Sequence, residues 1–230
     1  IALMKKQYEI IELLLKNEDI DVNTILETKT NTLFEEKSAL FLAVENEDKK
    51  IVELLLSHPN IDVNYTSISK SKNGSKIEKN TVLNMAIEKE NLAIIELLLK
   101  MPKIDINLKS FTRKSELKLI EESEELPICC AIMKGNIDIV KILLSYPSIN
   151  LSLKSKRSTF SPYSYFIEEK TPIQKAIISK NSNIIALLFQ SLITNSSCKI
   201  DVNELINMTD DEQLKAIIYD GISKLNLKKV

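Results

Sequence analysis

The side chains that could support catalysis are few and far apart in this chain. A serine or cysteine nucleophile needs a nearby base, and His58 is the single histidine among 230 residues. It precedes Pro59 at the end of an apolar segment, which is typical of a polar residue that completes a helix C-terminus. The three glycines, at positions 74, 135 and 221, are too scattered for a phosphate-binding loop. We therefore expect no enzyme activity and no cofactor.

Carboxylates and cysteines do not indicate a metal site either. The carboxylate runs at 121–122 and 210–212 are typical of solvated loops and helix starts. Cys129 and Cys130 are adjacent, and Cys198 makes the count odd, so the three cannot all pair within the chain. This pattern favours a reducing compartment. We expect no bound metal, and a cytoplasmic location with the nucleus as the alternative.

Charge and hydropathy argue against two classes of partner. The formal net charge of −1 creates no long-range attraction to nucleic acid or to an anionic membrane. The longest apolar runs, such as residues 184–189, are far too short to span a bilayer. We expect no nucleic-acid partner and no membrane insertion.

A phrase that recurs along the chain predicts the helices that would position any site. The phrase IVELLLSHPNIDVN fills residues 51–64, and variants of it begin at Ile10, Ile94, Ile139 and Ile184. The intervals between the starts are 41 to 45 residues. Self-similarity at such a period predicts stacked structural repeats instead of one closed core.

Each copy of the phrase predicts a helix that is apolar on more than one side. Apolar residues occupy positions i, i+1, i+3, i+4 and i+5, a stripe too wide for a helix that buries only one face. Such a helix needs neighbours on both flanks. We expect these helices to contribute one residue each to the core: Leu13, Leu54, Leu97, Ile142 and Leu187.

A second, shorter helix precedes each copy. An alanine stands eight residues before every copy, at Ala2, Ala43, Ala86, Ala131 and Ala176. Ser38 and Thr81 precede their helices and predict N-caps, and Thr171 with Gln174 predicts a capping box. Between the two helices lies a tight turn. We expect Asp48, Asn91 and Asn181 to adopt its left-handed conformation, because Asp and Asn tolerate it better than most residues.

These phrases resemble the ankyrin repeat, whose pattern is TPLHxAA, a turn, IVxxLL and a short loop with DVN. Residues 171–177, TPIQKAI, match the first half best, and residues 51–56, IVELLL, match the second half. The resemblance covers residues 1–203. The family's histidine is replaced by Phe41, Asn84, Cys129 and Gln174, and its turn glycine remains only as Gly135.

The resemblance implies an all-α fold, an ankyrin-type solenoid of stacked helix-turn-helix repeats with long β-hairpin or loop fingers. It implies a single domain over residues 1–230 with repeats at about 1–37, 38–80, 81–125, 126–170 and 171–203. A C-terminal half-repeat or cap would fill 204–230, with a capping box at Thr209 and Glu212 and a helix that ends before Gly221. The first repeat lacks its helix-start phrase, so we expect the chain to be a fragment of a longer protein.

The connections between repeats are longer than the family needs. They span 14, 16, 18 and 18 residues at 24–37, 65–80, 108–125 and 153–170. Asn73 and Gly74 predict a two-residue hairpin turn. The segment SELKLIEESEE, at 115–125, is expected to add a helical turn or to be disordered.

These fingers hold both arginines of the chain and seven of its 12 aromatic residues, which are Phe34, Tyr65, Phe111, Phe160, Tyr163, Tyr165 and Phe166. Aromatic residues and arginine are the residues that most often anchor interfaces. Two interpretations stay open. The aromatic side chains contact a partner, or they form small cores within the fingers.

The resemblance implies a module or scaffold that binds another protein, as a monomer or as a component of a larger assembly. Family members contact partners through hairpin tips and through two residues near the end of each first helix. Those helix positions are Glu45, Asn46, Glu88, Lys89, Met133, Lys134, Ile178 and Ser179. One alternative is the partner- or substrate-recruiting arm of a larger enzyme, such as a ubiquitin ligase or kinase. A weaker one is an anionic ligand bound by Lys70, Lys72, Lys76, Lys154, Lys156 and Arg157.

The finger at 153–170 is expected to be the main contact with the partner. It combines four aromatic residues, Arg157 and a proline. We expect Arg157, Phe160, Tyr163 and Tyr165 to take part, with the two tyrosines facing outward. Phe166 would then face the repeat stack.

Overall fold

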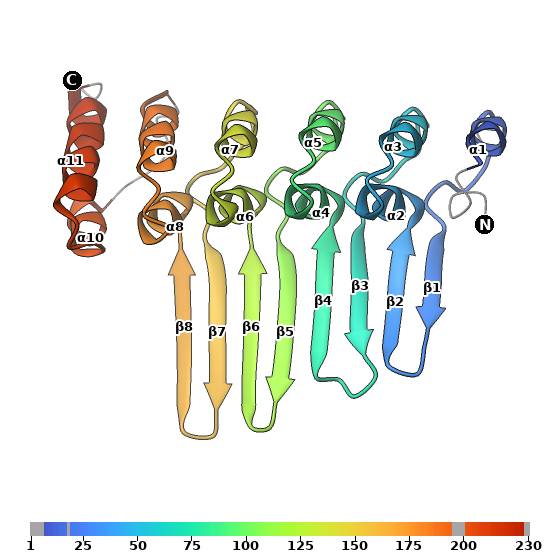
Figure 1. Ribbon diagram of the computed structural model, residues 1–230, viewed down its shortest axis with the longest axis horizontal. Coiled ribbons are helices and arrows are strands. Elements are labelled where there is room, and N and C mark those ends of the chain that lie inside the picture. Colours follow the sequence, from blue (N-terminus) through green and yellow to red (C-terminus); the bar gives the residue numbers. More distant parts are fainter. Residues whose placement is uncertain (1–6, 18, 195–200, 228–230) are drawn as a thin grey trace. The chain divides into compact units, whose positions relative to one another are not determined.

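The computed structural model describes residues 7–17, 19–194 and 201–227. Ala2 and Cys198, which the sequence analysis singled out, lie outside this part of the chain. Within it, two helices and a β-hairpin alternate along the sequence (Figure 1). The helices are α1 (Tyr8–Leu15), α2 (Ala39–Glu45), α3 (Lys49–Leu56), α4 (Val82–Glu88), α5 (Leu92–Leu99), α6 (Pro127–Lys134), α7 (Ile137–Leu144), α8 (Pro172–Ile178), α9 (Ser182–Thr194), α10 (Val202–Asn207) and α11 (Glu212–Leu227).

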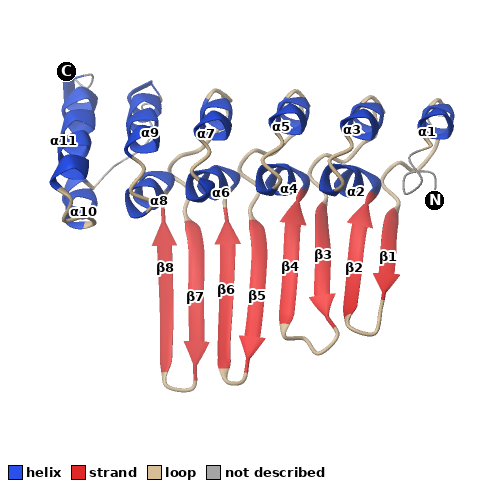
Figure 2. Ribbon diagram, viewed as in Figure 1, coloured by secondary structure: helices blue, strands red, loops and turns tan. Residues whose placement is uncertain are grey.

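The fingers are β-hairpins, so the expectation of an all-α fold is wrong in that respect (Figure 2). The strands are β1 (Ile25–Lys29), β2 (Leu33–Ser38), β3 (Thr66–Ser71), β4 (Lys76–Thr81), β5 (Ser110–Glu116), β6 (Leu119–Glu125), β7 (Ser155–Ser161) and β8 (Ser164–Lys170). They form a sheet in the order β1 to β8. From β1 to β6 each strand pairs antiparallel with the next one, within a hairpin and between hairpins alike.

Two finger predictions are corrected. Residues 115–125 are neither helical nor disordered, because β5 and β6 pair over their full lengths around a turn at Leu117, which has a φ of 52°. The β3–β4 connection has four residues, 72–75, and not two. Gly74 takes the left-handed conformation there, with a φ of 71°, and the Asn73 side chain accepts a hydrogen bond from the Ser75 N–H at 3.1 Å.

The chain divides into two compact units. Unit 1 holds residues 1–127 and 157–167, and therefore β1 to β6 with most of the β7–β8 hairpin. In it, α2 packs on α3 and α4, and α5 packs on α3 and α4. Unit 2 holds residues 128–156 and 168–230, where α9 packs on α7, α8 and α11.

The predicted N-caps are confirmed at two first helices. The Ser38 hydroxyl accepts a hydrogen bond from the Phe41 N–H at 3.1 Å, and the Thr81 hydroxyl accepts one from the Asn84 N–H at 3.0 Å. At the fifth repeat, Gln174 Oε1 accepts from the Thr171 N–H at 2.8 Å, as a capping box requires.

The tight turns do not shift as expected. Glu47, Glu90 and Lys180 take the left-handed conformation, with φ of 56°, 55° and 55°, at the position where Gly135 has a φ of 73°. The residue that follows instead caps the second helix, so that Asp48 Oδ1 accepts from the Ile51 N–H at 3.2 Å. Asn91, Asn136 and Asn181 cap α5, α7 and α9 in the same way.

The core residues of the second helices lie one position later than predicted. Leu55, Leu98, Leu143 and Leu188 are buried, whereas Leu54, Leu97, Ile142 and Leu187 are only half-buried and Leu13 is exposed. In the phrases that begin at Ile51, Ile94, Ile139 and Ile184, positions i, i+1 and i+4 form the buried stripe, as Ile51, Val52 and Leu55 do in α3. Position i+3 falls at the edge of that stripe.

The asparagines of the first two DVN phrases, Asn23 and Asn64, join neighbouring repeats. Asn64 Nδ2 donates to the Lys103 carbonyl at 2.7 Å, and Asn64 Oδ1 accepts from the Asp105 N–H at 2.8 Å. Asn23 makes the same two bonds with Asn60 and Asp62, at 2.7 and 2.8 Å. One side chain therefore connects two successive loops.

The C-terminal end departs from its prediction. Asp211, not Thr209, caps α11, since Asp211 Oδ1 accepts from the Leu214 N–H at 3.2 Å. The delayed IDVN phrase starts α10 instead of a loop, with Asp201 as its N-cap. Helix α11 does not end before Gly221 but continues to Leu227. A Cβ at Gly221 would lie 2.4 Å from the ring of Phe189 on α9, so this glycine permits close helix packing.

Candidate functional site

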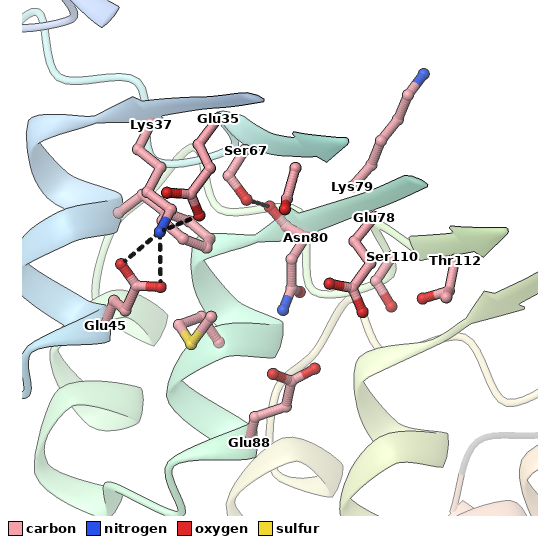
Figure 3. Close-up of a pocket in the computed structure, with 13 residues that line it drawn as sticks. Glu35, Lys37, Glu45, Ser67, Glu78, Lys79, Asn80, Glu88, Ser110 and Thr112 are labelled. Carbon is pink, nitrogen blue, oxygen red and sulfur yellow. Dashed lines mark hydrogen bonds and ion pairs between the residues drawn. The ribbon is translucent and has the colours of Figure 1, made fainter. Parts of the chain in front are cut away.

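A polar pocket of about 170 Å³ lies in unit 1, where strands β2 to β5 meet the ends of α2 and α4 (Figure 3). It is lined by Glu35, Lys37, Phe41, Glu45, Ser67, Ser69, Glu78, Lys79, Asn80, Met85, Glu88, Ser110 and Thr112. A single water needs about 10–15 Å³ on the same measure, so the pocket has room for a side-chain head group.

Strand register builds one wall of this pocket. Glu35 on β2 is paired with Ser69 on β3, Ser69 with Glu78 on β4, and Glu78 with Thr112 on β5. Alternate residues of a strand share a face, so Lys37, Ser67, Asn80 and Ser110 form a second row on the same face. Serine and threonine are short, and the longer side chains around them therefore enclose a hollow.

The two first helices supply the opposite wall. Glu45 is the last residue of α2 and Glu88 is the last residue of α4. Figure 3 shows both carboxylates directed toward the strands. Met85 of α4 also lines the pocket. Each helix follows its hairpin directly, because the last residue of β2 or β4, Ser38 or Thr81, is also the N-cap of the helix.

A half-buried cation, Lys37, occupies the part of the pocket next to β2. The Lys37 Nζ lies 2.9 Å from Glu35 Oε1 and 2.9 Å from Glu45 Oε2, and its side chain is 14% exposed. Burial lowers the pKa of Lys37, but the hydrogen bonds to Glu35 and Glu45 outweigh it, so the pKa lies above 10.5. Lys37 therefore stays charged at neutral pH.

The part next to β4 and β5 is lined by side chains that carry both hydrogen-bond acceptors and donors. Glu78, Asn80 and Glu88 point toward the same space in Figure 3, whereas the Lys79 ammonium points away from it. Asn80 Oδ1 is buried and has no hydrogen-bond donor among the described residues. Lys76 reaches Glu78 Oε1 at 2.8 Å.

The pocket contains two of the partner-binding residues predicted from sequence, Glu45 and Glu88. Asn46 and Lys89 are the C-caps of α2 and α4 and do not line it. In unit 2, Met133 and Lys134 end α6, and both side chains are exposed. Ile178 ends α8 half exposed, and the Ser179 hydroxyl donates to the Ala176 carbonyl at 2.8 Å.

The β7–β8 finger matches its prediction only in part. Tyr163 lies in the turn between the strands and is 92% exposed. Tyr165 stacks on Phe160, with ring centroids 4.6 Å apart, and Arg157 lies 3.6 Å from Glu121. Phe166 is 57% exposed, so the expectation that it faces the repeat stack is wrong. An edge strand has no further strand to bury such a side chain.

Two aromatic residues of the other fingers lie near charged groups of this chain. The Phe34 ring lies under two cations, Lys29 Nζ at 5.3 Å and Lys70 Nζ at 5.7 Å. Burial, together with Glu36, raises the pKa of Tyr65.

Three of the six cations considered for an anionic ligand lie near carboxylates: Lys76 near Glu78, Lys154 near Glu169 and Arg157 near Glu121.

Sequence reasoning missed most of the pocket residues. Ser67, Ser69, Ser110, Thr112, Glu78 and Asn80 lie on four-residue rows that only the register between strands creates. The available signal was the alternation of short polar residues in β3 and β5. That signal identifies a polar strand face and does not reveal which strands lie next to it.

The described residues hold no other arrangement with evident chemistry. His58 is buried, and its Nδ1 accepts a hydrogen bond from the Asn60 N–H at 3.3 Å, as expected of a residue that organises a helix end. No three His, Cys, Asp or Glu side chains come together as metal ligands within 7–17, 19–194 and 201–227. In the same ranges, no helix is both long enough and apolar enough to span a membrane.

Comparisons with known proteins agree with the repeat architecture. Residues 1–110 match the family model described as ankyrin repeats in three copies. The solved structure titled "Crystal Structure of EF0377 an Ankyrin Repeat Protein" is similar with a TM-score of 0.57 and 16% sequence identity. The match covers 96% of this chain and 94% of that chain, and at this identity it shows the fold alone. No curated protein matches this chain by sequence.

Proposed function

Because this chain is an ankyrin-repeat protein, we propose that it binds another protein through the pocket face of its hairpin sheet and the adjoining ends of α2 and α4. Ankyrin repeats generally mediate protein–protein interaction and are typically non-catalytic. The proposed setting is the cytoplasm or nucleus, with the chain acting alone or within a larger assembly.

The observation that carries this proposal is the pocket itself. Hairpin and helix side chains converge there around a polar hollow, and hydroxyl, amide and carboxylate groups point into it. Polar groups arranged around a recess favour recognition of a complementary polar group over simple solvation. The exposed Tyr163 at the β7–β8 turn supports a second contact, because tyrosine anchors many interfaces.

The test is site-specific photocrosslinking in cells. Benzoylphenylalanine in place of Thr112 puts the photoreactive group in the pocket. Benzoylphenylalanine in place of Arg113 puts it on the opposite face of the same strand, β5. The proposal expects a discrete partner band from Thr112 that excess unlabelled protein removes, and little or none from Arg113. Equal labelling from both positions, or labelling from Arg113 alone, would contradict it.

A third labelled position, at Tyr163, separates the two contacts. Labelling from Tyr163 without labelling from Thr112 would place the partner on the finger and not in the pocket.

A further inference from the structure

Strand β8 carries three successive apolar residues at the edge of the hairpin sheet. Tyr165, Phe166 and Ile167 are 60%, 57% and 42% exposed. Among the described residues, β8 is the last strand of the sheet and has a neighbouring strand only on its β7 side. The unpaired backbone groups of an edge strand can bind another strand, and exposed apolar side chains mark interaction surfaces. Both features coincide in β8.

The other edge of the sheet is protected by charge. Strand β1 also exposes an apolar residue, Leu26, but Glu27 and Lys29 follow it and form an ion pair at 3.1 Å. Charged side chains on an edge strand oppose the addition of a further strand. Residues 164–167 of β8 include no charged side chain. Strand β8 is therefore the edge that is better suited to pairing.

The geometry of the hairpin shows which backbone groups of β8 are free. A turn of two residues joins β7 to β8, so the last residue of β7 and the first residue of β8 form a hydrogen-bonded pair. Phe160 then lies opposite Tyr165, in agreement with the 4.6 Å between their ring centroids. Hydrogen bonds alternate between the two sides of an antiparallel strand. The N–H and C=O groups of Tyr165 and Ile167 therefore point to the free edge.

The sequence of β8 is complementary to itself about a two-fold axis. If Phe166 lies opposite Phe166 of a second copy, Tyr165 lies opposite Ile167 on each side of the axis. Each of these Tyr165–Ile167 pairs can exchange both of its backbone hydrogen bonds. Aromatic pairs and pairs of an aromatic with a β-branched residue stabilise neighbouring strands. Glu168 falls opposite Ser164, so no like charges oppose each other.

Other registers of the same two strands are less favourable. The free backbone groups recur at every second residue, so the register can move only in steps of two residues. One such step places Phe166 opposite Glu168, and the step in the other direction places it opposite Ser164. Both steps lose the central aromatic pair. The side chains therefore favour the register in which Phe166 lies on the axis.

We propose that β8 pairs antiparallel with β8 of a second copy of this chain, about a two-fold axis at Phe166. The two hairpin sheets then form one continuous sheet, and neither copy keeps a free β8 edge. Such an interface uses the same surface of both copies and closes at two. A contact made mainly by one pair of strands is small, so we expect a weak, reversible dimer. The inference goes beyond the proposed function, since no residue of β8 lines the pocket.

The test is sedimentation velocity of the intact chain under reducing conditions, from low micromolar to near-millimolar concentration. The inference expects a reversible equilibrium between monomer and dimer. Phe166→Glu puts two like charges at the axis and should weaken the dimer by about tenfold or more. Thr28→Glu adds the same charge to an exposed position of β1, at the other edge, and should leave the dimer unchanged. Circular dichroism checks that both variants keep the fold, as substitutions of exposed residues should.

A mixture of two variants tests the register. Phe166→Lys alone should also weaken the dimer, because two ammonium groups would then meet at the axis. An equal mixture of Phe166→Lys and Phe166→Glu should associate more tightly than either variant alone, because opposite charges then lie across the axis. This recovery requires that position 166 of one copy lies opposite position 166 of the other.

Several results would overturn the inference. They are a wild-type chain that stays monomeric at every concentration, a dimer that Phe166→Glu leaves intact, and a dimer that Thr28→Glu weakens equally. A mixture of the two Phe166 variants that associates no more than its components would also overturn it, because the two strands would then not meet at Phe166.

Discussion

Asn84 and Gln174 occupy the same position in two repeats, where the family has a histidine. Gln174 accepts from the Thr171 N–H at 2.8 Å and donates to Glu204 Oε1 at 2.6 Å. Asn84 is 1% exposed, and neither its Oδ1 nor its Nδ2 has a hydrogen-bond partner among the described residues. A buried amide without partners destabilises the folded state by about 1–3 kcal/mol.

We therefore predict opposite effects from the same substitution at these two positions. Asn84→Leu is expected to raise the free energy of unfolding by about 1 kcal/mol, because an apolar side chain of similar shape needs no partner. Gln174→Leu is expected to lower it by about 1–3 kcal/mol, because it removes the partner of Thr171 and of Glu204. Urea unfolding of both variants measures this, and a loss of stability in Asn84→Leu would contradict the prediction.

The raised pKa of Lys37 predicts that the free energy of unfolding changes with pH in the alkaline range. Its pKa is raised above 10.5 in the folded state, so the folded chain holds this proton more tightly than the unfolded chain does. The stabilisation is fully present below pH 10.5 and is lost as the pH rises through the higher folded pKa.

Other groups also titrate there, and a Lys37→Met variant isolates the effect. The difference in unfolding free energy between wild type and Lys37→Met should be constant at neutral pH and shrink above pH 10.5. A constant difference throughout would show that the ion pairs with Glu35 and Glu45 do not stabilise the charged form of Lys37.

At the scale of the elements, we predict that Asn64, the asparagine of the second DVN phrase, stabilises the stacking of two successive repeats. Asn64→Ala removes two hydrogen bonds, to the Lys103 carbonyl and from the Asp105 N–H. At about 0.5–1.5 kcal/mol each, their loss should lower the unfolding free energy by about 1–3 kcal/mol. Asn60→Ala is the matched control, because this exposed residue enters the same network through its main-chain carbonyl. Equal effects of the two changes in thermal or urea unfolding would contradict this role for Asn64.

We predict that replacing Gly221 with alanine, a better helix former, destabilises α11. Alanine is favoured over glycine within a helix by about 0.8–1 kcal/mol. Its Cβ would lie 2.4 Å from Phe189 Cγ, and such overpacking costs about 1–3 kcal/mol. Gly221→Ala should therefore lower the melting temperature, whereas Ser223→Ala, at an exposed position of the same helix, should not. Adding Phe189→Leu to Gly221→Ala should recover part of the loss, and a higher melting temperature for Gly221→Ala alone would refute the close approach.

The helices could be predicted from the sequence because their signals are local. The recurring phrase, the alanines and the N-caps at Ser38 and Thr81 each depend on residues within one or two turns. The β5–β6 hairpin could not, because its many charges suggest a solvated segment. In the structure these charges pair across strands, with Lys109 Nζ 3.1 Å from Glu124 and Arg113 Nε 3.7 Å from Glu122. Opposite charges on neighbouring strands stabilise this part of the sheet, although no alternation of apolar residues predicts its strands from the sequence.

At the scale of the whole chain, the candidate site was less predictable than the repeats that carry it. Glu45 and Glu88 followed from their helix positions, whereas Asn80 and Thr112 required the register between strands of different hairpins. That register depends on contacts between residues more than 30 positions apart. Only the structure shows that residues of different hairpins, such as Asn80 and Thr112, line one pocket.

Repeat arrays have a further property, since each repeat gains stability mainly from its immediate neighbours. Ala86 offers a test, because it is fully buried in α4, which packs on α2 and α5. Ala86→Phe inserts a ring where a methyl group fits and should cost about 1–3 kcal/mol or more. If stability is carried between neighbours, hydrogen exchange should accelerate most in α4, α5 and α2, and least in helices further along the chain. Lys89→Ala, at the exposed C-cap of the same helix, should change neither exchange nor melting temperature. An equal acceleration in every helix would show that the chain unfolds as one cooperative body, and equal effects of the two variants would refute the assignment of Ala86 to the packed side of α4.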